Sequence, residues 1–169
     1  VEAAEQLTRA LDQIATLPGT PVVRREQIKL QVALANALTH VKGYAAPEPK
    51  AAVERARQFI EQAEALGEPP EDPLLLFSVL YSAWAASFVA FNGDVARDLA
   101  SQFLALAEKQ EQTVPLMIGN RLMGNSLTLT GDIVKGRAHY NQAFALYDPA
   151  THRTLATRFG QDVGVSTLV

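Results

Sequence analysis

The sequence predicts an all-α protein, built as a solenoid of antiparallel helix hairpins with about seven helices. No stretch alternates between apolar and polar residues over the length of a strand. Proline, glycine and Asx residues divide the chain into segments of helical length. Four times, a small residue is followed by a larger apolar residue at +4 and by alanine at +7, so that all three share one helical face, and such recurrence is typical of stacked repeats. These triplets are Ala3–Leu7–Ala10, Ala56–Ile60–Ala63, Ala100–Leu104–Ala107 and Gly136–Tyr140–Ala143.

Three helices are expected before residue 68. The first, residues 2–16, ends at a segment with two prolines and a glycine, which stop a helix. The second, residues 23–41, ends at Lys42–Gly43, a cation followed by glycine that is typical of a helix C-terminus. A proline-stiffened loop, residues 44–49, leads to a third helix that ends at Leu66–Gly67. The loop is longer than a hairpin needs, so it covers a groove end, touches a neighbouring module or packs onto its own repeat.

The later helices are separated by equally clear signals. A run of prolines precedes the fourth helix, and Asp94 is expected to be the N-cap of the fifth. Gly131–Asp132 joins the sixth helix to the seventh, and Asp148–Pro149 ends the seventh. The expected ranges are about 73–92, 94–112, 114–130 and 133–147, then a short helix at 153–159 and the first turn of another at 162–169.

The helices are expected to pair as hairpins within a single domain, residues 1–169. Residues 1–17 are expected to be the second helix of a preceding repeat, and residues 153–169 the start of a further, truncated repeat. Because both ends are incomplete repeats, we expect a fragment of a larger protein whose uncapped ends self-associate. The complete repeats are expected over residues 22–67, with a long loop at 43–50, over 73–112 and over 114–149.

The composition narrows the classes of function. Of 169 residues, 48% are hydrophobic and 20% are charged, and a net charge of −3 offers no basic surface for nucleic acid. The absence of cysteine excludes disulfides and thiolate metal sites and fits a cytoplasmic protein. Residues 73–92 carry no charge and are long enough to span a bilayer, but serines interrupt them and acidic residues flank them. They are therefore expected to form the central helix of the stack, with a membrane span as the alternative.

Residues 116–149 resemble a tetratricopeptide repeat. The chain departs from that pattern at Asn120, where the pattern prefers tryptophan, at Gly136, where it prefers alanine, and at Pro149, which comes one residue late. The resemblance implies a right-handed solenoid whose role is protein–protein interaction. The residues that carry it are Met123–Gly124, Leu127, Gly131–Asp132, Gly136, Tyr140, Ala143 and Pro149.

Three short strings give a narrower resemblance. They are residues 15–18, residues 41–48, and residues 146–149 together with His152–Arg153 and 159–164. They are similar to the helical region that follows the ATPase module in bacterial adenylate/guanylate cyclase-type signalling proteins. The resemblance implies a regulatory fragment whose partner is a protein, a peptide or the upstream ATPase/cyclase module. The sequence has no G-x-x-x-x-G-K-[ST] loop, so no ATP site, catalytic residue or cofactor is expected in it.

In tetratricopeptide stacks the first helix of each hairpin lines a concave groove, which here implies a binding surface on the second, fourth and sixth helices. Arg121, Asn125 and Thr128 share one stripe and are able to hydrogen-bond a peptide or grip a carboxylate. Alternatively, these three solvate an open face, and His40 caps its own helix. The expected groove residues are Lys29, Asn36, Thr39, His40, Ala83, Ser87, Phe91, Arg121, Asn125 and Thr128.

The aromatic residues of the fourth helix leave a second function open. Trp84, Phe88 and Phe91 are expected on one helical face, either packed in the core or anchoring a partner peptide. In the alternative function they line a pocket, and the chain is a small-molecule effector-sensing domain of an ATP-dependent transcriptional regulator. The three histidines show no metal-ligand spacing, so no metal site is expected.

Overall fold

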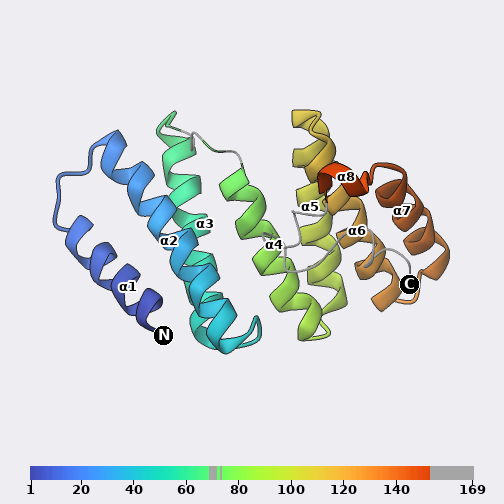
Figure 1. Ribbon diagram of the computed structural model, residues 1–169, viewed down its shortest axis with the longest axis horizontal. Helices are drawn as coiled ribbons and strands as arrows, with labels where there is room; N and C mark the ends of the chain where they lie inside the picture. The colour runs from blue at the N-terminus through green and yellow to red at the C-terminus, as the bar shows by residue number, and fades with distance from the viewer. Residues whose placement is uncertain (69–71, 73, 153–169) are drawn as a thin grey trace. The chain divides into compact units, whose positions relative to one another are not determined.

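The computed structural model describes residues 1–68, 72 and 74–152, and within these ranges the protein consists of eight α-helices and no strand. The prediction of an all-α fold is confirmed. The eighth helix is a short turn that follows the seven longer helices. The helices are α1 (Glu2–Ile14), α2 (Pro21–Lys42), α3 (Pro47–Ala65), α4 (Leu74–Val89), α5 (Gly93–Gln110), α6 (Thr113–Leu129), α7 (Ile133–Ala145) and α8 (Pro149–His152) (Figure 1).

The chain divides into two compact units, Val1–Ala90 and Phe91–Val169. The first unit holds α1 to α4, and the second holds α5 to α8 (Figure 1). The boundary falls between α4 and α5, which the sequence pattern assigns to one repeat, residues 73–112. Each unit is therefore described by itself.

Neighbouring helices of the first unit alternate in direction. Lys42 at the end of α2 pairs with Glu48 at the start of α3, and Arg24 near the start of α2 pairs with Glu68 just after α3. These two ion pairs show that α2 and α3 are antiparallel. The start of α1 and the end of α2 line one hollow, so this pair is antiparallel too. α4 packs against α3 and α2.

The core of the first unit lies between α2, α3 and α4. It includes the triplet Ala56, Ile60 and Ala63, each of which is at most 1% exposed. The two alanines allow α2 and α3 to approach closely, and Ile60 fills the space beside them. The buried residues around the triplet are Ile28, Val32, Ala35, Ala52, Val53 and Val79.

In the second unit, α6 packs against both α5 and α7. A Cβ atom built on Gly119 would lie 3.0 Å from the Leu104 side chain of α5, and one built on Gly124 would lie 2.6 Å from the Tyr140 ring of α7. Glycine fits here because a Cβ atom would meet these side chains, so that the helices would have to separate or the side chains to move. The start of α5, at Gly93, lies beside the end of α6, so these two helices are antiparallel.

Several helix ends follow the signals read from the sequence. At the start of α2, for which no cap was predicted, the Thr20 hydroxyl accepts a hydrogen bond from the Val23 amide at 3.3 Å. α3 ends at Gly67, whose φ is +73°, and the following amide bonds back to the Ala63 carbonyl at 2.8 Å. Gly131, with φ +90°, ends α6 in the same way. These are Schellman motifs, in which glycine adopts the left-handed conformation at little cost.

Two helix starts differ from the prediction. The loop expected at 43–50 is shorter because α3 begins at Pro47, and prolines fit the first helical turn, where no amide hydrogen is required. Asp94 is not the N-cap of α5, because the helix already begins at Gly93 and Asp94 lies in its first turn. The elements expected within residues 153–169 lie outside the described residues.

Candidate functional site

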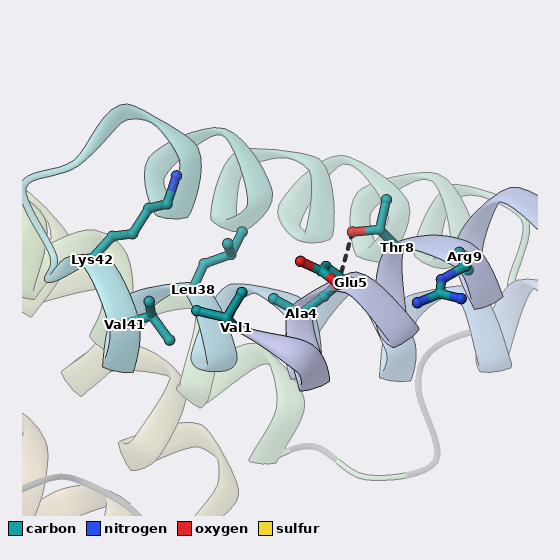
Figure 2. A pocket seen from close by; sticks show the side chains of 8 residues that line it. All are labelled: Val1, Ala4, Glu5, Thr8, Arg9, Leu38, Val41 and Lys42. Atoms are coloured by element: carbon teal, nitrogen blue, oxygen red, sulfur yellow. Dashed lines mark hydrogen bonds between the residues drawn. The ribbon is translucent and has the colours of Figure 1, made fainter.

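The first unit carries two hollows along α1 and α2 that join into one groove. The first has a volume of about 480 Å³ and is lined by residues between Val1 and Arg9 and by the last turns of α2 (Figure 2). The second, of about 430 Å³, is lined by α1, α2 and α3. Thr8 and Leu38 line both hollows. We call the joined surface the α1–α3 groove.

The floor of the groove is one stripe of α2. Gln27, Gln31, Leu34 and Leu38 follow one another at +4, +3 and +4, so they share a helical face. The stripe has two glutamines toward one end and two leucines toward the other. Apolar wall residues come from both neighbouring helices: Leu11 and Ala15 of α1, and Ala51, Ala52 and Phe59 of α3.

Gln31 is a buried polar group in this floor. It is 4% exposed, and its Nε2 donates to the Ala52 carbonyl of α3 at 3.2 Å. This hydrogen bond fixes the side-chain amide and ties α2 to α3. Within the described ranges no residue donates to the Gln31 Oε1, which therefore remains an acceptor at the groove.

Charged side chains stand on both walls. Asp12 of α1 and Arg55 of α3 line the second hollow, and neither forms an ion pair within the described part of the chain. Near the end of α2, Lys42 bonds to Glu48, and this hydrogen bond lowers the pKa of the Glu48 carboxyl. The groove therefore offers a carboxylate on one wall and a guanidinium on the other, with two glutamines and two leucines on the floor between them.

The groove is elongated and open. The stretch of α2 from Gln27 to Lys42 spans about 22 Å at the usual helical rise per residue. Val1 is 75% exposed and Val41 is 51% exposed, so a molecule bound against them keeps one side in solvent. Such a shape suits a length of polypeptide better than a compact small molecule, which binds best in an enclosed cavity.

The α2 residues expected to line a groove lie on the other side of the helix. Lys29, Asn36 and His40 are exposed and about half a turn away from the groove stripe, and neither hollow is lined by them or by Thr39. The His40 Nδ1 donates to the Asn36 carbonyl at 2.8 Å, which is the capping role given above as the alternative. The Thr39 hydroxyl likewise donates to the carbonyl of Ala35.

The three candidates in or beside α4 have different surroundings. Ala83 is half-buried and packs against the core of the first unit. Ser87 is half-buried, and its hydroxyl donates to the Ala83 carbonyl at 3.1 Å. Phe91 lies beyond the end of α4, so its expected place on a helical face with Trp84 and Phe88 is wrong. The chain turns there: Phe91 is 82% exposed and has φ +56°, a left-handed conformation that is costly for a residue with a Cβ atom. Trp84 is 4% exposed and stacks on Phe88 at 5.0 Å between ring centroids.

The three α6 residues that were expected to line a groove, Arg121, Asn125 and Thr128, do not form a solvent-exposed face. Arg121 is 1% exposed. Asn125 is half-buried, and its Oδ1 accepts a hydrogen bond from the Tyr140 hydroxyl at 2.7 Å. Of the three, Thr128 alone is exposed. The reason is that α6 has a helix packed on each of two sides, so polar side chains along it are enclosed and used within the unit.

Sequence reasoning missed a polar pair that joins α6 to α7. The Asn120 Nδ2 donates to the Leu116 carbonyl at 2.9 Å, and its Oδ1 accepts from the His139 Nδ1 at 2.8 Å. Asn120 is 7% exposed, and burial lowers the pKa of His139. The available signal was an asparagine on a mostly apolar helix, at the place where the repeat pattern prefers tryptophan. A buried asparagine needs a partner, and the next helix supplies one.

Comparisons with protein-family models, with curated proteins and with solved structures found no match for this chain. Across the residues described, no group of three or more His, Asp or Glu side chains is placed to hold a metal ion. None of the described helices combines the length and the apolar character needed to cross a bilayer.

Proposed function

We propose that the chain is a non-catalytic interaction module, a right-handed tetratricopeptide-like solenoid segment that binds part of another protein in the α1–α3 groove. The groove carries this proposal, because it combines length, apolar residues on its floor and walls, and a buried amide acceptor at Gln31. The antiparallel helices within each unit are the elements from which such solenoids are stacked.

The groove offers several kinds of contact to a polypeptide. Leu38, which is half-buried and lines both hollows, presents apolar surface, which supplies affinity when a partner side chain covers it. Gln31 accepts a hydrogen bond from an N–H group of the partner. Arg55 is suited to a carboxylate, which it binds through two parallel hydrogen bonds, and Asp12 is suited to a cation or a further N–H group. A few polar groups in an apolar groove fix the register of the ligand.

We further propose that the module works in the cytoplasm as the regulatory arm of a bacterial signalling protein of the adenylate/guanylate cyclase or ATPase type. The resemblance of the three short strings supports this context. The groove partner is then a separate protein or the upstream module of the same protein. A cyclase or P-loop domain encoded upstream in the same reading frame would support the proposal, and a different output domain would refute it.

The effector-sensing function stays the alternative. Among the described residues, the two hollows of the α1–α3 groove include none from α4, and the Trp84 ring stacks on Phe88.

Peptide display tests the groove directly. Peptides selected against the chain should lose at least about tenfold in affinity for Leu38→Glu, since a charge in the centre of the floor removes the apolar contact. Val134→Glu is the matched control, because this residue is 83% exposed on α7 and lies outside the groove. Failure to enrich any peptide, or equal binding to both variants, would reject the proposed function.

A further inference from the structure

Three polar side chains surround one part of the α1–α3 groove. Gln31 lies on the floor, Asp12 on the α1 wall and Arg55 on the α3 wall, and all three line the second hollow. Gln31 is buried, whereas Asp12 and Arg55 are exposed. Within the described residues neither of these two charges has an ionic partner. A carboxylate and a guanidinium on opposite walls are therefore both available to a ligand.

The three residues lie within about one helical turn of one another along the groove. The Gln31 amide bonds to an α3 carbonyl three residues before Arg55, which corresponds to a rise of about 4.5 Å. The second hollow is lined on α1 between residues 8 and 15 and on α2 between residues 27 and 38. Asp12 and Gln31 each come near the middle of their segment. Because α1 and α2 are antiparallel, Asp12 stands close to the level of Gln31.

Gln31 favours an extended ligand over a helical one. Its Nε2 is held by the Ala52 carbonyl, so its Oε1 is the atom left to accept a hydrogen bond from a ligand. Beyond the first turn of an α-helix, every backbone N–H already bonds to a carbonyl of the same helix. An extended peptide instead carries N–H groups along both edges. It is therefore able to lay one edge on the floor and donate to Gln31, much as an added strand bonds to a sheet edge.

The alternation of side chains in an extended peptide matches the charges of the two walls. Successive side chains point to opposite faces, so a peptide with one edge on the floor directs them toward the α1 wall and the α3 wall in turn. Residues an odd number of positions apart reach opposite walls. At about 3.3 Å per residue, a spacing of one or three positions covers the levels of Asp12 and Arg55. A spacing of two would place both side chains on the same wall.

We infer that the partner segment is an extended peptide with an acidic and a basic residue one or three positions apart. Its carboxylate binds Arg55, its cation binds Asp12 and one backbone N–H donates to Gln31. The inference rests on the proposed function and adds the conformation and the charge pattern of the ligand. Arg55 is suited to bind the carboxylate through two parallel hydrogen bonds. Leu38, about 10 Å from Gln31 along α2, contacts the peptide about three residues away and fixes its direction (Figure 2).

Exchange of the wall charges tests the pattern. Random octapeptides are displayed on phage and selected against the unmodified chain, and loss of binding to Leu38→Glu identifies the groove peptides. These should contain the odd-spaced acidic and basic residues. The unmodified chain should bind such a peptide at least about fivefold more tightly than Asp12→Lys/Arg55→Glu does, as two partly exposed ion pairs imply. The same peptide with its acidic and basic residues exchanged should show the opposite preference. Asp94→Lys/Arg97→Glu is the matched control, because it exchanges an exposed pair on α5, and it should bind like the unmodified chain.

Replacement of single backbone amides by esters tests the extended conformation. Each ester removes one N–H of a groove peptide, and one position should weaken binding to the unmodified chain about fivefold. The same ester should have no effect on binding to Gln31→Met, which lacks the acceptor. Circular dichroism verifies that this variant is folded; if it is not, the ester series on the unmodified chain decides.

Three results would overturn the inference and leave the proposed function intact. They are groove peptides without the odd-spaced charges, a preference that does not reverse when the charges are exchanged, and binding that no single ester weakens. An ester effect that persists in folded Gln31→Met would likewise overturn it. If no selected peptide depends on Leu38, the proposed function itself is rejected, and the inference with it.

Discussion

Gly124→Ala gives a sharp test of the packing in the second unit, because two effects of opposite sign act at this position. Alanine favours the helix over glycine by about 1 kcal/mol. Against this, the added Cβ would lie 2.6 Å from two ring atoms of Tyr140 and 3.1 Å from the Gly136 carbonyl oxygen. Contact at these distances forces α6 and α7 apart or moves the ring.

The contact should outweigh the helix preference. Adding a methyl group to a tightly packed interface costs about 1–3 kcal/mol. A shift of the Tyr140 ring also breaks its hydrogen bond to Asn125, 2.7 Å long, at a cost of about 1 kcal/mol. Set against the gain of about 1 kcal/mol from helix propensity, the expected loss in unfolding free energy is about 1–3 kcal/mol.

Urea unfolding followed by circular dichroism measures this change, and a double-mutant cycle identifies its source. In a Tyr140→Ala background the two 2.6 Å contacts are gone and only the 3.1 Å contact with the Gly136 carbonyl oxygen remains, so Gly124→Ala should destabilise the protein clearly less than it does in the unmodified chain. Stabilisation by Gly124→Ala in the unmodified chain would show that the two helices are not in close contact at Gly124 and would refute the packing argument.

Three further predictions concern other parts of the chain. Arg24→Ala should lower the unfolding free energy by about 1 kcal/mol, because Arg24 forms two 2.8 Å hydrogen bonds to the half-buried Glu68; coupling near zero in a double-mutant cycle with Glu68→Ala would contradict this. Burial lowers the pKa of His139 below its ordinary value of 6.5, so the unfolded chain binds more protons as pH falls below 6.5. The stability that neutral His139 provides should therefore be complete above pH 6.5 and decline from there down to its folded-state pKa, and His139→Gln should flatten this part of a stability–pH profile; an unchanged slope would count against it. Phe91→Gly should leave stability unchanged or raise it by up to about 1 kcal/mol, because glycine removes the left-handed strain and little buried surface is lost; a clear loss in thermal unfolding would mean that the Phe91 ring makes stabilising contacts.

Helix number and most helix ends could be predicted from the sequence because they depend on local chemistry. Gly67 and Gly131 end α3 and α6 as expected, since glycine accepts a positive φ wherever it stands in the fold. The start of α3 was misplaced for a related reason. Proline is both a helix breaker and a good first residue, and Pro47 acts in the second way.

The candidate site was harder to predict because it depends on which face of a helix is covered. α2 carries two polar stripes: one with Lys29, Asn36 and His40, which was expected at the groove, and one with Gln27 and Gln31, which was not. Only the second borders the groove, and the choice is made by where α1 and α3 pack. Arg121 and Asn125 do lie on one face of α6, as their spacing of four residues predicts. The spacing of polar residues does not show whether that face is solvated or is enclosed and hydrogen-bonded within the protein.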